Sequence, residues 1–396
     1  MICAGQRLGP GSNDSAFPPP LEEAVRLAIR RELAERSTRI GYVSASAGPD
    51  IVFGEEVIAR GGELHVLLPC EERDFLDQYV TPAGCNWGDR FRSLCARAAN
   101  VEISCEERLL GDETLLRFNN QMLQGIGRIH AERIGVRPHL LLVWNPAAPA
   151  EAGSPADFMD QWPELENLSI IDLDDLREQI GLGADIESPA ASDLSFGTSP
   201  RAIRAILFAD IATYTSFRDE QVPLLWDFLA EVQQIVEERA KPPILINTWG
   251  DAVHAAAETA QDLADYATAL ADTIRIVDIR TFGLESRPRL RIALHAGPVY
   301  VGLHPLTGRS MIYGHHVNRA ARIEPIAAPG EIHASHHFVA LLRSEMDACQ
   351  HEAHVLGKQY HPPYRLEYVG MMDLPKKFGR EAIYRVVRRG PDGAAG

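Results

Sequence analysis

Short apolar runs alternate with amphipathic stretches through the first half of the chain. The runs have the length and composition of buried strands, and the stretches between them repeat apolar residues at helical spacing. Strand–helix alternation of this kind is typical of a parallel α/β sheet. The predicted strands are residues 39–44, 63–69, 101–105, 138–144 and 168–173, and the predicted helices include 51–60 and 116–134.

The second half of the chain follows a different pattern, in which strands and helices mix without strict alternation. This order predicts an α+β domain. The predicted elements are a strand at 201–211, a helix at 222–240, a pair of strands over 243–257 that turn at 249–251, a helix at 259–279, a strand at 289–303, a helix at 317–326 and further strands to 387.

Two stretches without periodic apolar residues mark the predicted domain boundaries. Residues 1–20 are rich in Gly, Pro and Ser, and residues 183–200 are rich in Ser, Ala, Pro and Asp. We expect the first to be a disordered tail and the second a linker. The predicted domains are therefore 21–182 and 201–388, and 389–396 form a second tail.

Charge and cysteine usage narrow the class of protein. The 396 residues carry a formal net charge of −16, which argues against nucleic acid or an anionic membrane surface as a partner. The six cysteines are scattered without a C-x-x-C pair, and no apolar run reaches the length of a membrane helix. These features, together with an N-terminus unlike a signal peptide, predict a cytoplasmic protein.

Two carboxylates close predicted strands in the second domain. Asp210 follows the apolar run 206–209, and Asp251 follows Trp249 and Gly250 about forty residues later. An ionised Asp at a buried strand end is unfavourable unless it is paired or binds a metal ion. Two of them could hold two divalent ions against a triphosphate, with the turn from Ile211 to Thr215 cradling the phosphates. The alternative is that each Asp only caps the turn that follows it.

Residues 314–322 (GHHVNRAAR) open a helix on which Asn318 and Arg322 lie four residues apart, on one face. An arginine is a forked donor to phosphate, and an asparagine can hold a ribose or a developing charge. The same pair is also compatible with a solvated helix face.

Together these segments resemble the class III adenylate and guanylate cyclases, in the order and spacing of that family. The matching segments are 208–211 (FADI) with Thr215, 248–251 (TWGD), 291–299 (RIALHAGPV), 314–322 and 329–332 (PGEI). The resemblance covers about 185 residues and implies a nucleotidyl cyclase, a phosphorus–oxygen lyase that makes a cyclic nucleotide and pyrophosphate.

The resemblance also implies a ferredoxin-like core that works as a homodimer with active sites at the interface. Asp210 and Asp251, with the backbone carbonyl of Ile211, match the ligands of two divalent ions, Mg²⁺ or Mn²⁺. Asn318 and Arg322 match the pair that stabilises the transition state from the opposite subunit. Lys376, in 375–379 (PKKFG), matches a lysine that contacts phosphate.

The positions that read the purine in adenylate cyclases hold Asn247 and Met311 here, so neither the adenine set nor the guanine set is present. By strand alternation Trp249 lies beside Asn247 and Tyr313 beside Met311. Bulky side chains there favour a pyrimidine triphosphate, UTP or CTP, as in the bacterial antiphage cyclases, whose product would be read by a separate effector. The alternatives are that the aromatics pack in the dimer interface, and that ATP or GTP is read by a variant pocket.

Three histidines of the second domain have simple structural interpretations. His315 and His316 are adjacent on a helix start, which suits capping or an interface better than metal binding. His295 lies within an apolar strand and is expected to be a satisfied core residue.

The first domain resembles Rossmann-like domains of the SLOG type. Residues 41–50 (GYVSASAGPD) place a loop of small residues between a strand and a helix, where backbone amides could meet a phosphate. This predicts a small-molecule or protein regulator bound by the first domain; the alternative is a structural or interaction domain that presents the cyclase. For the whole chain, the alternative to an active cyclase is a sensor that binds nucleotide without cyclising it.

Overall fold

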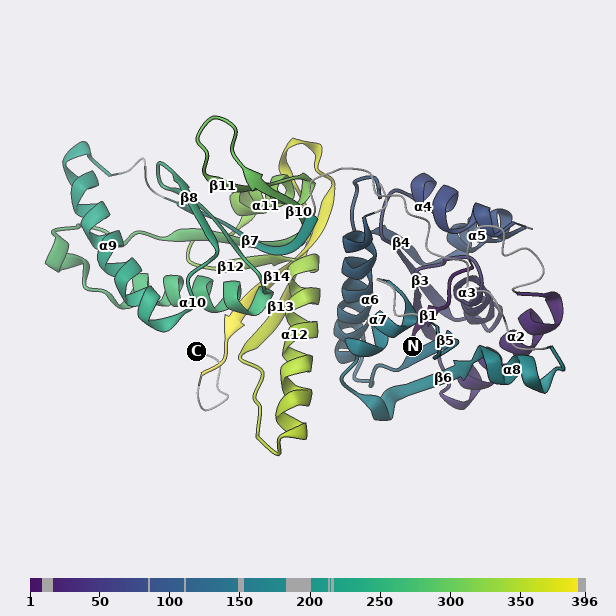
Figure 1. Ribbon diagram of the computed structural model, residues 1–396. Coiled ribbons are helices and arrows are strands. Elements are labelled where there is room, and N and C mark those ends of the chain that lie inside the picture. Colours follow the sequence, from purple (N-terminus) through teal and green to yellow (C-terminus); the bar gives the residue numbers. More distant parts are fainter. Residues whose placement is uncertain are drawn as a thin grey trace. The chain divides into compact units, whose positions relative to one another are not determined.

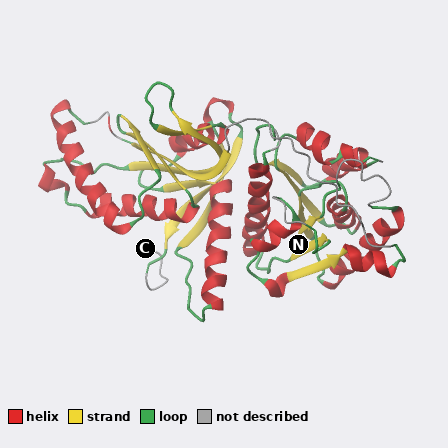
Figure 2. Cartoon of the chain, in the orientation of Figure 1, coloured by secondary structure: helices red, strands yellow, loops and turns green. Residues whose placement is uncertain are grey.

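The computed structural model describes residues 1–8, 17–84, 86–109, 112–148, 153–182, 201–212, 214 and 217–390. The chain divides into two compact units, Met1–Thr198 and Ser199–Gly396 (Figures 1 and 2). The predicted linker over 183–200 lies outside the described residues, as does the predicted tail from 391 onward. No helix among the described residues combines the length and apolar character needed to cross a membrane.

The N-terminal unit is built on a six-stranded sheet in which every pair of neighbours is parallel. The predicted parallel α/β sheet is therefore present. The strand order is β4-β3-β2-β1-β5-β6. The strands are β1 (Ile2–Gly5), β2 (Ile40–Val43), β3 (Glu63–Leu68), β4 (Asn100–Ile103), β5 (Leu140–Trp144) and β6 (Leu168–Asp172).

Helices connect these strands and cover the sheet (Figure 1). All five residues of β5 are buried, as expected for a parallel strand covered on both faces. The helices are α2 (Pro19–Glu35), α3 (Pro49–Ala59), α4 (Glu72–Tyr79), α5 (Trp87–Arg97), α6 (Glu113–Arg133), α7 (Pro155–Asp160) and α8 (Leu173–Gln179).

The expectation of a disordered tail over 1–20 is wrong where the structure describes it. Residues 2–5 form β1, which lies in the middle of the sheet between β2 and β5, and α2 begins at Pro19. The run contains Cys, Ala and Gly instead of several β-branched or aromatic residues, and a stretch rich in Gly, Pro and Ser follows it, so the sequence carries little strand signal there. Proline in the first turn of a helix is tolerated because its missing N–H has no partner there anyway.

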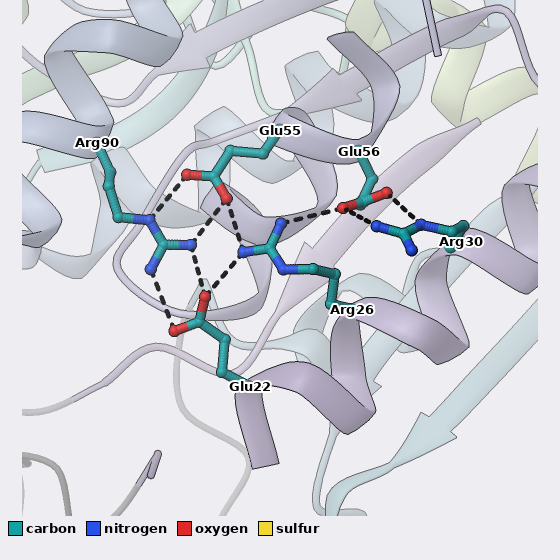
Figure 3. Close-up of polar contacts among 6 residues, drawn as sticks. All are labelled: Glu22, Arg26, Arg30, Glu55, Glu56 and Arg90. Carbon is teal, nitrogen blue, oxygen red and sulfur yellow. Dashed lines mark hydrogen bonds and ion pairs between the residues drawn. The ribbon is translucent and has the colours of Figure 1, made fainter. Parts of the chain in front are cut away.

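A network of charged side chains joins α2 to α3 and α5 (Figure 3). Arg26 contacts three carboxylates at 2.8 to 3.0 Å, and Arg90 contacts two of the same carboxylates at 2.8 and 2.9 Å. Each acid faces at least one guanidinium, so the charges compensate one another. The members are Glu22, Arg26, Arg30, Glu55, Glu56 and Arg90.

The C-terminal unit is built on a mixed eight-stranded sheet in the order β13-β14-β12-β10-β7-β9-β8, with β11 paired to β10. The β10–β12 pair is parallel and the others are antiparallel. The strands are β7 (Arg201–Ile211), β8 (Leu245–Trp249), β9 (Ala252–Ala257), β10 (Leu290–Leu303), β11 (Ser310–Tyr313), β12 (Ile332–Ser335), β13 (Tyr364–Asp373) and β14 (Arg380–Arg388).

The helices of this unit lie on both faces of the sheet. In Figure 1, α10 and α12 lie on one side, and α11 with β11 on the other. Ile206 and Phe208 of β7 pack in one apolar cluster with Ala320 of α11, so even-numbered residues of β7 face α11. The helices are α9 (Val222–Arg239), α10 (Ala260–Ile276), α11 (His315–Ile323) and α12 (His336–Val355).

The expectation that strands follow one another up to residue 387 is wrong for α12. This helix has 20 residues and buries Phe338, Leu341 and Leu342 among others, while Ser335 caps its first turn by accepting from the Phe338 amide. Both the apolar spacing and the cap are present in the sequence.

Candidate active site

Asp210 and Asp251 come together because a hairpin lies beside β7. Asp210 is the penultimate residue of β7, on the face that carries α11. Gly250, with φ of 60°, makes the turn between β8 and β9 and places Asp251 at its end. Since Ala209 pairs with Val253, the register brings Asp251 level with Ile211. The two predicted metal ligands are therefore neighbours at one end of the sheet.

The two carboxyl groups interact strongly. Burial, followed by the hydrogen bond and the charge of Asp251, raises the pKa of Asp210 to about 6. The backbone amide of Ile211 and the charge of Arg291, which pairs with Asp210 on β10, oppose this shift. A carboxylate whose charge is disfavoured by burial and by a neighbouring acid is stabilised when a cation binds beside it.

A third carboxyl group, Glu324, lies in the same electrostatic environment. It begins a short 3-10 turn after α11. Burial raises its pKa, and the charges of Asp210 and Asp251 raise it further, whereas Arg291 lowers it. Its Oε1 atom is buried and, among the described residues, has no hydrogen-bond partner. Glu324 and Arg291 were not predicted as site residues, because only the register of β10 and the packing of α11 bring them to Asp210.

The donor set fits Mg²⁺ or Mn²⁺ better than a softer ion. The described residues contain no group of three or more His, Cys, Asp or Glu side chains arranged to hold a metal. Two carboxylates and the Ile211 carbonyl would leave most coordination positions to water or substrate. That is the usual arrangement for Mg²⁺, which binds through one or two carboxylates together with phosphates.

Helix α11 carries Asn318 and Arg322 away from its buried side. His316, Ala320 and Ile323 are its buried residues. At 100° per residue, Asn318 and Arg322 lie roughly on the opposite side, and Asn318 is exposed. The guanidinium of Arg322 lies 5.5 Å from the centroid of the Phe378 ring, and its Nε is buried.

The loop of Lys376 is held next to α11 by the same Phe378, whose ring also stacks on His315 at 5.6 Å. Lys376 and Lys377 adopt left-handed backbone conformations, with φ of 58° and 63°. Such conformations are unfavourable for residues with a side chain and are often found at functional sites. Lys376 is exposed at the start of this strained turn.

The predicted base-reading positions lie on different strands. Asn247 of β8 pairs with His254 of β9, which pairs in turn with Phe208 of β7. The His254 ring stacks on Phe208 at 4.6 Å, burial lowers its pKa to about 4, and its buried Nε2 has no partner among the described residues. Met311 pairs with Gly302 at the far end of β10. His254 was missed as a neighbour of the base position.

The aromatic side chains near these positions differ in their surroundings. Trp249 is 91% exposed at the end of its hairpin. The Tyr313 ring packs within its own unit, where it stacks on the Tyr300 ring with 5.4 Å between the ring centroids. Thr215, predicted to help cradle the phosphates, lies outside the described residues.

The predicted roles of the three histidines are partly correct. His295 is a satisfied core residue, fully buried and bonded on both ring nitrogens. His316 is 2% exposed and packs against His295, so the expected capping or interface role is wrong for it. The N-cap residue of α11 is Gly314.

The loop of the N-terminal unit that was expected to meet a phosphate is filled by the protein itself. The amides of Gly5 and Ser46 donate to Asp50, at 2.7 and 3.1 Å, and the Ala47 amide donates to the Tyr79 carbonyl. The cavity beside this loop has a volume of about 30 Å³, which suits an ordered water rather than a nucleotide. Two amides of the loop, those of Ser46 and Ala47, are therefore already paired within the protein.

A family model described as "Adenylate and Guanylate cyclase catalytic domain" matches residues 201–367. Retinal guanylyl cyclase 2 of Bos taurus is 33% identical over 117 residues, and that of Rattus norvegicus is 31% identical over 117 residues. Each match covers 28% of this chain and 9% of the relative. The predicted resemblance of the C-terminal domain to this family is thus confirmed, and the resemblance of the first domain stays a prediction.

Solved cyclase structures are similar to about half of the chain. The adenylyl cyclase CyaB from P. aeruginosa is 19% identical, with a TM-score of 0.38, and the match covers 49% of this chain and 98% of that one. The guanylate cyclase domain of RhGC from Catenaria anguillulae, in complex with GTP, is 20% identical, with a TM-score of 0.37, and the match covers 48% of this chain and 98% of that one.

Proposed function

We propose that the chain is a nucleotidyl cyclase, which converts a nucleoside triphosphate into a 3′,5′-cyclic nucleotide and pyrophosphate. The observation that carries this proposal is the Asp210–Asp251 pair: burial and the neighbouring Asp251 raise the pKa of Asp210, which supports a site that takes up positive charge. A pair of this kind at the end of a buried strand suits the binding of divalent ions and a triphosphate.

In this reaction the ribose 3′-oxygen attacks the α-phosphorus in line, and the bond from that phosphorus to the β-phosphate oxygen breaks. Asp210, Asp251 and the Ile211 carbonyl would hold two ions, Mg²⁺ or Mn²⁺, which when bound lower the pKa of the hydroxyl and neutralise the triphosphate. Arg322 would donate to the phosphate that develops charge, Asn318 would orient the ribose, and Lys376 would bind the leaving pyrophosphate.

A homodimer is the form in which these groups would meet one substrate. Asn318 and Arg322 lie on the side of α11 away from their own sheet, so they suit a substrate held by a second copy. Large apolar side chains stand exposed on the hairpins of the same unit: Trp249 is 91% exposed and Leu306 is 89% exposed. A second copy would cover such residues.

The substrate base is proposed to be a pyrimidine, uracil or cytosine. Asn247 and His254 each offer a neutral polar group that can donate or accept, and the lysine and aspartate that select adenine are absent. Met311 leaves the second reading position without a charged or hydrogen-bonding side chain. A purine substrate read by this variant set is the alternative, and a cyclic pyrimidine product would suit a signal in antiviral defence that a separate effector reads.

Product analysis tests the proposal directly. The purified full chain is incubated with ATP, GTP, CTP and UTP in separate reactions with Mg²⁺ or Mn²⁺, and products are identified by mass spectrometry. We expect one cyclic pyrimidine nucleotide with equimolar pyrophosphate, and no product from Asp210→Ala. A cyclic purine alone would overturn the base assignment and leave the cyclase in place.

A nucleotide sensor without catalysis is the second candidate, favoured by the altered residues at positions 247 and 311. It predicts binding of a triphosphate without release of pyrophosphate. Equilibrium binding of each triphosphate in the presence of Ca²⁺, together with a pyrophosphate assay in Mn²⁺, separates the two: binding without turnover supports the sensor. A regulator acting through the N-terminal unit is proposed for either case.

A further inference from the structure

A chain of buried hydrogen bonds connects α11 to the centre of the C-terminal sheet. The Ser335 hydroxyl lies 2.7 Å from His295 Nδ1, and His295 Nε2 lies 2.9 Å from His316 Nδ1. The exposed fractions of the three residues are 0%, 0% and 2%. They come from β12, β10 and α11, so the chain links two adjacent strands to the helix.

Both histidine rings are neutral in this environment. Burial lowers the pKa of His295 and of His316 well below the usual range, and the mutual repulsion of the histidines adds to the effect. A neutral imidazole carries one N–H, so His295 donates a hydrogen bond through one ring nitrogen and accepts one through the other. The hydrogen bonds from Ser335 to His316 therefore all point the same way. Ser335 is held in turn, because its oxygen also accepts from the Phe338 amide at 3.1 Å.

The His316 ring occupies space that glycine leaves free on β10. A Cβ atom at Gly297 would lie 2.2 Å from His316 Nδ1, far inside any real contact between carbon and nitrogen. The ring therefore packs directly on the backbone of the strand. The His316 ring can move little, because one of its faces packs on the strand backbone and its Nδ1 is hydrogen-bonded to His295.

A second buried contact holds the same side of the helix. Arg319 Nη1 lies 2.6 Å from Glu381 Oε2 on β14, and the two side chains are 12% and 5% exposed. His337 of α12 lies 3.8 Å from the same carboxylate. Two polar contacts one turn apart, to different strands, define the rotation of α11 about its own axis.

We propose that Ser335, His295 and His316 are positioning residues, which set the rotation of α11 and so aim Asn318 and Arg322 at the substrate. The two functional side chains lie roughly opposite His316 on the helix. A rotation of about 20° moves an atom about 6 Å from the axis by about 2 Å. A displacement of that size is enough to lower the rate of a reaction strongly. The inference rests on the proposed cyclase function.

Single substitutions at His316 separate the hydrogen bond from the bulk of the ring. Asparagine places an amide atom near the position of Nδ1, glutamine places it near Nε2, and leucine keeps volume without a polar atom. We expect His316→Leu and His316→Gln to lower kcat about 10- to 100-fold with KM within about threefold, and His316→Asn to retain more than a third of kcat.

His139→Leu is the matched control. His139 is also buried, at 8% exposure, and bonds a serine, since its Nε2 lies 3.0 Å from the Ser169 hydroxyl in the N-terminal unit. We expect this variant to lower the melting temperature without changing kcat. Hydrogen exchange of the amides of 315–323 is measured in all variants, and it should rise in His316→Leu and stay at the wild-type level in His316→Asn and His139→Leu.

The results decide the proposal even where a variant folds poorly. Gly297→Ala should raise exchange in α11 in the wild-type background and have little effect in His316→Ala, which has no ring to displace. Equal kcat for His316→Leu and His316→Asn, or unchanged exchange in α11, would overturn the positioning role. If the wild-type protein cyclises no triphosphate, the proposed function fails. The hydrogen-exchange results alone then decide whether the Ser335–His295–His316 hydrogen bonds orient α11.

Discussion

Each unit of the protein contains a carboxyl group whose pKa is raised to about 6, with burial as the largest cause, but the two groups have opposite surroundings. Asp50 is 3% exposed and accepts three hydrogen bonds, from the Gly5 amide and from the amide and hydroxyl of Ser46. Burial raises its pKa and these donors lower it. The pKa of Asp210 is raised by burial and also by a second carboxylate, Asp251.

The difference separates a completed site from an incomplete one. The donors around Asp50 already provide what a negative charge needs inside a protein, so nothing else has to bind there. At Asp210 the strongest neighbour is another acid, and the charge of Arg291 offsets only part of the effect, so positive charge from ions or substrate would stabilise the site. A shifted pKa identifies a functional site only when the cause of the shift is known.

The largest expected effect is on activity at Asp210. Asp210→Asn removes one charge from the proposed ion site, and we expect kcat to fall at least about 1,000-fold, because the ions contribute several kcal/mol to the transition state. Asp50→Asn should leave kcat within about twofold. Rates of pyrophosphate release in Mn²⁺ measure both variants. Equal losses of activity would break the distinction between the two sites.

The next effect is on stability at Asp50. Asp50→Ala leaves the Gly5 amide and both donors of Ser46 without their acceptor, and we expect the free energy of unfolding of the N-terminal unit to fall by about 2–4 kcal/mol. Urea unfolding followed by hydrogen exchange of β1 and α3 measures it. Asp50→Asn keeps one acceptor oxygen, so its free energy of unfolding should fall clearly less. A fall as large as that of Asp50→Ala would mean that the charge of Asp50, and not its acceptor oxygens, stabilises the unit.

A smaller effect concerns the pH dependence of stability without divalent ions. Asp210 has a folded pKa near 6 and an ordinary value of 3.8, so its stabilising contribution is present below about pH 4 and is lost as the pH rises through 6. After a discount for solvent screening, we expect about 0.5–1 kcal/mol. Asp210→Asn should therefore melt about 1–4 °C higher than the wild type at pH 7.5 in EDTA.

Added Mn²⁺ should reverse that order, because it stabilises the wild type and not Asp210→Asn. Asp50→Asn provides the comparison, since its melting temperature should respond to Mn²⁺ like that of the wild type. Melting curves of the three proteins are recorded at pH 5 and pH 7.5, each with EDTA or with Mn²⁺. A wild-type melting temperature that ignores Mn²⁺ would contradict the ion site.

The smallest effect is expected in the charged network of Figure 3. The side chain of Arg30 is 49% exposed and contacts Glu56 at 2.9 Å, whereas Arg26 still neutralises the same acid at 3.0 Å. We expect Arg30→Ala to shift the melting temperature by less than about 1 °C. A shift of several degrees would show that this network, like the Asp210 site, depends on each of its charges.

Local patterns predicted most of the strands and the paired aspartates. β7 was predicted with its observed bounds, and Asp251 follows from a tight hairpin whose turn residues are adjacent in sequence. The predictions failed for β1, whose Cys, Ala and Gly residues carry little strand propensity, and for α12, whose sequence has the apolar spacing and the N-cap of a helix.

The remaining parts of the site depend on contacts that spacing does not contain. Arg291 reaches Asp210 only through the register of β10 against β7. His316 reaches His295 only because Gly297 lets the helix approach the strand. Such contacts join residues about 20 to 80 positions apart, and no periodicity in the sequence encodes them.

The central position of β1 has a consequence for the order in which the N-terminal unit is assembled. β1 can pair with β2 as soon as Val43 has left the ribosome, but its other edge pairs with β5, which begins at Leu140. The roughly 100 residues between them take about 5–20 s to synthesise. Throughout that interval the middle of the sheet keeps one open edge, so mispairing with other nascent chains is most probable at this strand.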